Sequence, residues 1–223
     1  MWRDRDSDRA AGFRLLRQRL IDRGDPRTML CTSPNGGDGK TTLASNLALA
    51  FAELGRHRVL LIEATLRSAQ LGEVFGFKPP RGFGVQLARH RANPNDAWVV
   101  VQIGQTPMYV LAAEPRYCPH CGAIIAADAR FCGMCGKSVP VGPPAALDAV
   151  TFSAAVQRFR EAFDYILVDA PSVLAGGDVN LIQDACEVVV FAAKTGRSEA
   201  RDLRRAVEQV APAQVAAVAL MDS

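Results

Sequence analysis

The chain has 223 residues, of which 49% are hydrophobic and 22% are charged, and these proportions exclude a disordered or fibrous protein. The length suits one well-buried domain with a small addition and is too short for two full domains. The formal charge is only +3, so we expect no nucleic-acid partner.

No apolar run in the sequence is long enough to span a bilayer. The first residues, MWRDRD, lack the apolar core of a signal peptide. We therefore expect a cytoplasmic protein.

The first third of the chain predicts a helix followed by a strand, a turn, a helix and a strand. Apolar residues at helical spacing predict an amphipathic helix over 10–21. The apolar run 29–32 predicts a strand that enters a Gly-rich turn, and 41–54, rich in Ala and Leu, predicts a helix. The continuous apolar run 58–62 predicts a second strand, buried on both faces.

The signals in the middle of the chain are weaker, and the alternation then resumes. A weak helical pattern covers 85–90, and strand-like runs cover 98–101 and 108–111. One helical face then carries four apolar side chains, those of Phe152, Val156, Phe159 and Phe163. The remaining predicted elements are strands over 165–169, 187–192 and 215–220 and a helix over 199–210. Such alternation predicts a doubly wound, mostly parallel α/β sheet, which binds ligands at the carboxyl ends of its strands.

The Gly-rich turn has the composition of a phosphate-binding loop (P-loop). Residues 34–42 read PNGGDGKTT between the first strand and the next helix. Backbone N–H groups of such a turn can converge on phosphates, and the lysine reaches the outer ones. The predicted nucleotide-binding residues are Asn35, Gly36, Gly37, Asp38, Gly39, Lys40, Thr41 and Thr42. Pro34 stands where the usual pattern has glycine, so the motif is a variant; the alternative is a Gly-rich turn that caps an ordinary helix.

A nucleotide triphosphate also needs a divalent cation, so we predict ATP and Mg²⁺ as cofactors. The Thr41 hydroxyl is positioned to complete a Mg²⁺ shell. Asp169, at the end of the strand over 165–169, is the expected acidic partner. The alternative for Asp169 is a helix-capping or turn aspartate.

Four cysteines form two Cys-x-x-Cys pairs, each followed by glycine. Such pairs supply the tetrahedral thiolate ligands of a structural Zn²⁺. The predicted zinc ligands are Cys118, Cys121, Cys132 and Cys135; redox pairs or free thiols are the alternative. The remaining two, Cys31 and Cys186, lie in or beside apolar segments and are interpreted as structural thiols.

These signals divide the chain into a principal domain and a small insert. Residues 1–27 are a helical lead-in, and 28–113 together with 140–223 form the nucleotide-binding domain. Residues 114–139 are the inserted zinc ribbon, a docking or stabilising module whose folding depends on the metal.

Taken together, several segments resemble the bacterial tyrosine kinases (BY-kinases) of capsule and exopolysaccharide systems, which are related to septum-positioning and partition ATPases. The segments are FRLLR at 13–17, TSPNGGDGKTT at 32–42, ASNLA at 44–48, VLLIEATLR at 59–67 and FDYILVDAP at 163–171, with Asp178 downstream. The resemblance implies a cytoplasmic ATPase or kinase module. It also implies recruitment to the inner face of the membrane by a membrane-anchored polysaccharide co-polymerase that acts as its activator.

The resemblance also implies catalytic residues, and here the chain departs from the family. Lys40 and Asp169 match the family. The family's Asp-x-Asp-x-Arg, which serves the metal and the incoming tyrosine hydroxyl, becomes Glu63, Thr65 and Arg67. Glu63 keeps a carboxylate, whereas Thr65 cannot serve as a carboxylate ligand or base, and its loss could slow phosphoryl transfer by orders of magnitude.

Three further departures concern assembly, the phosphate acceptor and the likeness to the partition-type relatives. The family's oligomer-forming Glu-x-x-Arg-x-x-Arg reads Ala11, Arg14 and Arg17, without the acidic partner of a homo-oligomer salt bridge. The family's tyrosine-rich tail is missing from the 223 residues. Asn35 replaces the lysine that marks the partition-type relatives.

Three hypotheses follow. The first is a slow ATPase with tyrosine kinase activity. The second is a catalytically degenerate nucleotide-binding subunit that acts as a regulator or adaptor through its zinc ribbon. The third is a partition-type organiser ATPase, which is disfavoured because no amphipathic helix follows the last predicted strand to bind a membrane.

Overall fold

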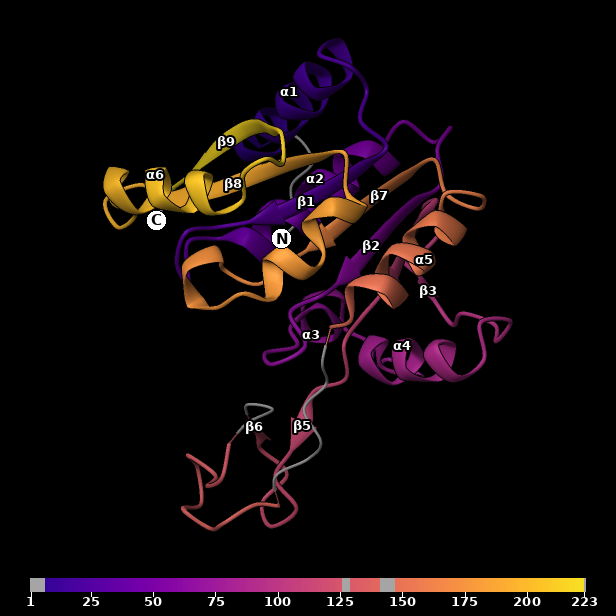
Figure 1. The fold of residues 1–223 in the computed structure, drawn as a ribbon, viewed down its shortest axis with the longest axis vertical. Helices are drawn as coiled ribbons and strands as arrows, with labels where there is room; N and C mark the ends of the chain where they lie inside the picture. Colours follow the sequence, from indigo (N-terminus) through magenta and orange to yellow (C-terminus); the bar gives the residue numbers. More distant parts are fainter. Residues whose placement is uncertain (1–6, 126–128, 141–146, 223) are drawn as a thin grey trace.

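A twisted, mostly parallel sheet forms the centre of the computed structural model, which describes residues 7–125, 129–140 and 147–222 (Figure 1). Its strands are β1 (Thr28–Thr32), β2 (Val59–Glu63), β3 (Val101–Gln102), β4 (Met108–Leu111), β7 (Tyr165–Asp169), β8 (Val188–Lys194) and β9 (Val215–Met221). They lie in the order β3-β4-β2-β7-β1-β8-β9. Every neighbouring pair is parallel except β3 with β4. The predicted doubly wound sheet is confirmed.

Helices cover both faces of this sheet (Figure 1). They are α1 (Asp8–Asp22), α2 (Lys40–Ala52), α3 (Leu71–Phe75), α4 (Phe83–Ala92), α5 (Ala149–Phe159) and α6 (Ala200–Gln209). Short 3₁₀ turns η1 (Val173–Ala175), η2 (Asp178–Leu181) and η3 (Gln183–Ala185) follow β7. One buried cluster joins α1 and α2 to the sheet, and a second joins α4, α5 and α6 to it.

Helix α2 owes its position to its sequence. It is apolar around almost its whole circumference, and its residues from Leu43 to Ala52 are all buried. A helix that is apolar all round needs cover on several sides, and α2 receives it from the sheet and from α1. Since α2 begins at Lys40, this burial fixes the end of the Gly-rich turn.

Two predicted elements differ from the structure. The predicted strand 98–101 is reduced to β3, which begins at Val101, because the Gln86 side chain binds both backbone groups of Val99. Its Oε1 accepts from the Val99 N–H at 2.7 Å, and its Nε2 donates to the Val99 carbonyl at 2.9 Å. Helix α5 begins earlier than its apolar face, at Ala149, where the Asp148 carboxylate caps it.

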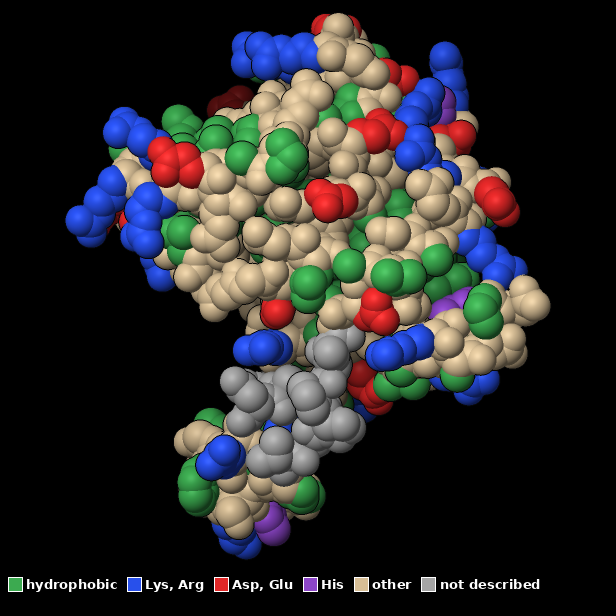
Figure 2. All heavy atoms as spheres, viewed as in Figure 1, with side chains coloured by type: hydrophobic (Ala, Val, Ile, Leu, Met, Phe, Trp, Pro, Cys, Tyr) green, Lys and Arg blue, Asp and Glu red, His purple; other side chains and the backbone are tan. Residues whose placement is uncertain are grey.

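The cysteine-containing insert forms a separate lobe beyond the carboxyl end of β4 (Figure 1; Figure 2, lower part). Strands β5 (Arg116–Tyr117) and β6 (Ile124–Ile125) pair antiparallel in a hairpin outside the main sheet. Its small buried cluster contains Cys118, Ile125, Cys132 and Val139. Two cysteines therefore supply part of the little core that this lobe has, as expected for a metal-dependent module.

None of the helices in the described ranges is both long and apolar enough to cross a bilayer.

Candidate functional site

The Gly-rich turn connects β1 to α2, at the carboxyl edge of the sheet. Gly37 and Gly39 have φ angles of +85° and +96°, a region that favours glycine. Gly39 stands at the N-cap of α2 and offers no side chain there, so backbone N–H groups at the helix start are free to meet a ligand. A Cβ atom at Gly37 would lie 2.7 Å from the Arg197 guanidinium.

Two of the predicted loop residues hold the loop rather than line its cavity. Asp38 is 1% exposed, and its Oδ2 accepts from the Asn35 N–H at 2.9 Å. The Asn35 side-chain amide donates to Asp202 Oδ2 at 2.9 Å, which ties the loop to the start of α6. Asn35 thus occupies a structural position in the loop.

Behind the loop, the Thr41 hydroxyl donates to Asp169 Oδ2 at 2.8 Å. Asp169 ends β7 and is fully buried, and its other oxygen, Oδ1, has no hydrogen-bond partner among the described residues. Burial raises the pKa of Asp169 to about 6, although Lys40 and the Thr41 hydroxyl act in the opposite direction. A hydroxyl and a carboxylate oxygen are the hard ligands that Mg²⁺ prefers, so this pair fits the cation.

A cavity of about 590 Å³ opens in front of this pair, within the usual size range of small-molecule sites. Its lining comes from three parts of the chain: Gly36, Gly37, Gly39, Lys40, Thr41 and Thr42 of the loop; Thr65, Arg67, Ser68 and Gln70 after β2; and Pro171, Ser172, Ala175, Gly176, Gly177 and Asp178 after β7. All three segments follow parallel strands, so their meeting at one edge is a consequence of the topology. Ser68, Gln70 and Ser172 carried no motif and were missed from the sequence; only their position just after a strand could have indicated them.

Glu63, the predicted catalytic carboxylate, does not reach this cavity. It is fully buried, and its Oε1 accepts from the N–H groups of Gln70 and of Leu71, the latter at 3.0 Å. Its Oε2 accepts from the Ala113 N–H at 2.9 Å. Burial raises the pKa of Glu63 to about 7; the three N–H groups lower it and the nearby Asp169 charge adds to the rise.

The two other residues of that predicted motif do line the cavity. The Thr65 hydroxyl donates to the Asp169 backbone carbonyl at 3.3 Å. The Arg67 side chain is 67% exposed, and its Nε lies 3.9 Å from Asp178 Oδ2. Arg67 therefore brings a solvated positive charge to the cavity mouth.

In the insert, the ligand atoms of Cys118, Cys121, Cys132 and Cys135 all lie within 4.8 Å of one another. Two of the Sγ–Sγ distances are 3.8 Å and 3.6 Å. Tetrahedral zinc with Zn–S bonds of about 2.3 Å requires sulfur atoms roughly 3.8 Å apart, so the four thiols fit the ion. His120, between Cys118 and Cys121, is exposed, with its ring 3.2 Å from the Ser138 carbonyl, and is not part of the thiol cluster.

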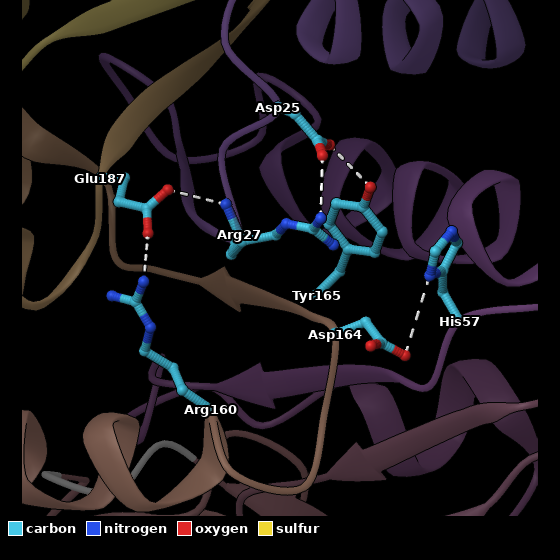
Figure 3. A network of polar contacts seen from close by, with 7 residues as sticks. All are labelled: Asp25, Arg27, His57, Arg160, Asp164, Tyr165 and Glu187. Carbon is cyan, nitrogen blue, oxygen red and sulfur yellow. Dashed lines mark hydrogen bonds and ion pairs between the residues drawn. The ribbon is translucent and has the colours of Figure 1, made fainter.

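A polar network occupies the opposite, amino-terminal edge of the sheet (Figure 3). The Tyr165 hydroxyl donates to Asp25 at 2.7 Å, and the Arg27 guanidinium lies 4.7 Å from the tyrosine ring centre. Glu187 bonds the Arg27 N–H and the Arg160 side chain, each at 2.7 Å. These contacts join β1, β7 and β8 at the end away from the cavity, so we interpret them as structural.

The fold and the loop define the class: an α/β protein with a P-loop-type turn at the carboxyl edge of a mostly parallel sheet and with a four-cysteine insert. A family model of the zinc-ribbon domain matches residues 117–139. The tyrosine-protein kinase CpsD of Streptococcus pneumoniae serotype 4 is 27% identical over 179 residues, 80% of this chain and 67% of the relative. The kinase domain of the Escherichia coli tyrosine kinase ETK superposes with a TM-score of 0.74 at 18% identity, over 96% of this chain and 75% of that one.

A more distant relationship is also present. The septum site-determining protein MinD of Synechocystis is 26% identical over 74% of this chain and 52% of that protein. The chain is therefore similar to the bacterial tyrosine kinases and, over a smaller share of the relative's length, to a MinD protein, and its residues 117–139 match the zinc-ribbon family.

Proposed function

We propose that this chain binds ATP with Mg²⁺ in the cavity at the Gly-rich loop and is a slow ATPase of the BY-kinase type, with protein-tyrosine phosphorylation as its associated activity. The observation that carries the proposal is the Thr41–Asp169 pair. A buried carboxylate with one unpartnered oxygen, beside a threonine that directly follows Lys40, suits a cation on a bound polyphosphate.

In this proposal, the loop and the residues around it have separate roles. The N–H groups at the start of α2 face the phosphates, and Lys40 carries the positive charge that reaches the outer ones. Thr41 and Asp169 hold the cation, with Asp169 in its ionised form. When bound, Mg²⁺ neutralises charge that develops on the transferred phosphoryl group. Arg67 would add a second positive charge at the cavity mouth.

The proposed rate is slow because carboxylates are scarce where a nucleophile would need one. Thr65 offers only a hydroxyl, and that hydroxyl already donates to a backbone carbonyl. Glu63 is held by backbone N–H groups. Asp178 lines the cavity, but its Oδ2 lies 3.9 Å from the Arg67 Nε, so this carboxylate already faces a cation.

The names of the relatives suggest a place for this activity. Since BY-kinases belong to capsule and exopolysaccharide systems, we infer a role in polysaccharide synthesis or export. The partner would be a membrane-anchored co-polymerase that recruits this chain from the cytoplasm to the inner face of the membrane. The ribbon offers a surface for such contacts: Tyr117, Ile124, Phe131 and Met134 are 46%, 54%, 67% and 81% exposed.

Helix α1 carries the two arginines that match the oligomer-forming positions of the family, Arg14 and Arg17. Arg14, in the position of a family oligomer-forming arginine, makes a bidentate ion pair with Glu53 of the same chain, with both N···O distances 2.7 Å. Arg17 donates to the Ala50 carbonyl. Both side chains thus bind α1 to α2. A homo-oligomer of this protein would therefore need to use other contacts, or to exchange these.

The direct test is incubation of the purified protein with radiolabelled ATP and Mg²⁺, alone and with a candidate membrane activator, while free phosphate and labelled tyrosine are both followed. Phosphate release without labelled tyrosine would show ATPase activity without tyrosine kinase activity. Label on tyrosine would establish the kinase; Tyr117 is then the site to inspect first, because it is 46% exposed, whereas Tyr165 is 2% exposed and Tyr109 packs against the core. Neither product, despite tight binding, would contradict the enzymatic proposal.

That last outcome would favour a second candidate, a nucleotide-responsive adaptor that performs little chemistry and contacts its partner through the ribbon. Thr65 in the cavity is the observation that favours it. The MinD relationship keeps a partition-type organiser ATPase as a third candidate; recruitment to lipid vesicles in the presence of ATP would distinguish it.

A further inference from the structure

Glu63 connects the end of β2 to the segment just after it and to a third segment 50 residues further along the chain. It ends β2, opposite Asp169 in the sheet register. Its carboxyl group binds backbone N–H groups at two places, the 70–71 segment and Ala113. Glu63 and Leu71 are 0% exposed and Ala113 is 2% exposed, so the hydrogen bonds to Leu71 and Ala113 are shielded from water, whereas Gln70 is exposed.

The first of these places closes one wall of the nucleotide cavity. We call residues 64–70, between Glu63 and its own hydrogen-bond partner, the cavity wall. Thr65, Arg67, Ser68 and Gln70 of this segment line the cavity. Because Glu63 binds the far end of the segment, the wall is a closed loop, held at its start by Asp169 and at its end by the Glu63 side chain.

The second place is the stem of the zinc ribbon, residues 112–115, which leads from β4 to β5. Its Ala112 carbonyl accepts from the Phe83 N–H at 2.8 Å. Glu114 lies so close to Gly82 that a Cβ atom there would be 2.7 Å from the Glu114 nitrogen. The stem is therefore fixed by α4 on one side and by Glu63 on the other.

The ribbon hairpin also faces the cavity wall. A second cavity of about 300 Å³ separates them, lined by Leu66, Arg67, Ser68, Ala69 and Gln70 of the wall and by Arg116, Ile124 and Ile125 of the ribbon hairpin. Arg67, Ser68 and Gln70 line both cavities. The wall thus has the nucleotide cavity on one side and the ribbon on the other.

We propose that Glu63 is a positioning residue that couples the zinc ribbon to the nucleotide cavity, because one buried carboxyl group fixes both the cavity wall and the ribbon stem. A partner that binds the ribbon would act on the stem, and the hydrogen bonds of Glu63 carry the change to the wall. Coupling between two sites is reciprocal, so a nucleotide in the cavity also affects the ribbon stem. This inference rests on the proposed nucleotide binding.

This role differs from the catalytic one expected for Glu63. A general base or metal ligand needs an oxygen directed at the reacting groups, whereas both oxygens of Glu63 are directed at backbone N–H groups. Removal of a positioning residue makes the segments that it holds more mobile. Removal of a general base leaves the conformation of those segments unchanged.

The first experiment measures backbone amide hydrogen exchange in the zinc-loaded full chain, with and without saturating Mg-ADP. In the wild-type protein, Mg-ADP should slow exchange in the Gly-rich loop, at Leu71 and in the ribbon stem. In Glu63→Ala, the slowing in the loop should remain and the slowing in the stem should be lost. The control is Glu208→Ala on α6, an exposed glutamate that lines neither cavity and should behave as wild type.

A second variant distinguishes the two ends of the connection. Glu63→Gln keeps one carbonyl oxygen for the Gln70 and Leu71 N–H groups but turns an amide NH₂ toward the Ala113 N–H. Exchange at Ala113 should therefore accelerate about fivefold to tenfold while Leu71 stays protected. In Glu63→Ala, both should accelerate.

Three outcomes decide the matter. If Mg-ADP slows amide exchange in the loop of the wild-type protein but not in the ribbon stem, the coupling is overturned. Unchanged exchange in both variants, with phosphate release lost equally from both, would instead make Glu63 catalytic and overturn its positioning role. If the loop itself does not respond to Mg-ADP, the proposed nucleotide binding fails, whereas the variants alone still test whether Glu63 holds the stem.

Discussion

The hydroxyl of Thr41 and the carboxylate of Asp169 lie 2.8 Å apart, although the two residues are separated by 128 positions in the chain. The contact joins the first turn of α2 to the end of β7, across the parallel pair β1 and β7. Asp169 Oδ1 is left buried without a partner in the part of the chain that the structure describes. A buried oxygen of this kind normally has a ligand, and a cation is the ligand that suits a carboxylate.

Asp169→Asn should weaken the binding of Mg-ATP while the fold stays intact. The amide keeps the shape but loses the charge, and a hydrogen bond or ligand contact of a charged group contributes about 1.5–3 kcal/mol. The expected loss of affinity is about 10- to 100-fold with Mg²⁺ and much smaller in EDTA. Titration of each protein with a fluorescent ATP analogue measures both values.

The control for this variant is Asp164→Asn, the same substitution at the opposite end of the same strand. Asp164 comes directly before β7, does not line the cavity, and accepts from the Arg58 N–H at 2.7 Å; Figure 3 shows it beside His57. It should leave the affinity unchanged. Equal losses in both variants would indicate a general effect on the fold and would remove the role assigned to Asp169.

The affinity for Mg-ATP should fall in acid. The pKa of Asp169 is raised to about 6 by burial, so the ionised form that binds the cation predominates above this pH and is replaced by the protonated form below it. Between pH 7 and pH 5 the contribution of Asp169 should decrease about tenfold. Because ATP also takes up a proton in this range, the relevant quantity is the difference from Asp169→Asn, whose affinity should depend less on pH.

Thr65→Asp should increase phosphoryl transfer. Thr65 lines the cavity and its backbone follows the end of β2, so an aspartate there would place a carboxylate where the BY-kinase pattern has one. We expect faster phosphate release with little change in ATP affinity, because the gain is in the reacting state. Rates under single-turnover conditions measure it. Thr65→Asn, which adds bulk without charge, is the control, and an equal rise in both would argue against a missing carboxylate.

Cys132→Ser should release the zinc and leave nucleotide binding within a few-fold of wild type. The four thiols form their own cluster in a lobe outside the main sheet, and three ligands hold Zn²⁺ far more weakly than four. Metal content by mass spectrometry and ATP affinity are the two readouts. Cys186→Ser should retain its zinc; loss of nucleotide binding along with the zinc would mean that the ribbon is part of the main fold.

The sheet was predictable from sequence because its main strands are continuous apolar runs. Segments with helical composition or helical spacing of apolar residues separate these runs. The four cysteines that meet in the insert could also be identified, since Cys-x-x-Cys spacing is local. Long-range contacts were not accessible in this way. Glu63 has the position of a catalytic carboxylate in the chain, but its hydrogen bonds to Leu71 and Ala113 depend on where α3 and the ribbon stem lie.

The irregular segments escaped prediction for a related reason. Trp98 and Val99 have strand-like side chains, yet Trp98 stacks on His90 with ring centres 3.7 Å apart, and Gln86 binds the backbone of Val99. Here the Gln86 side chain makes the backbone hydrogen bonds that a neighbouring strand would otherwise make, and such a contact has no periodic pattern in the sequence. Helix α3, only five residues long, is likewise too short to show one.

The measurement that tests the central claim most directly is calorimetric titration of ATP with Mg²⁺ into the wild-type protein and into Lys40→Ala. Lys40 begins α2 and lines the cavity. We predict saturable binding to the wild type at one site per chain and none to the variant at the same concentrations, with unchanged circular dichroism. Equal affinity in the two proteins would contradict the assignment of residues 34–42 as the phosphate-binding loop and, with it, the proposed function.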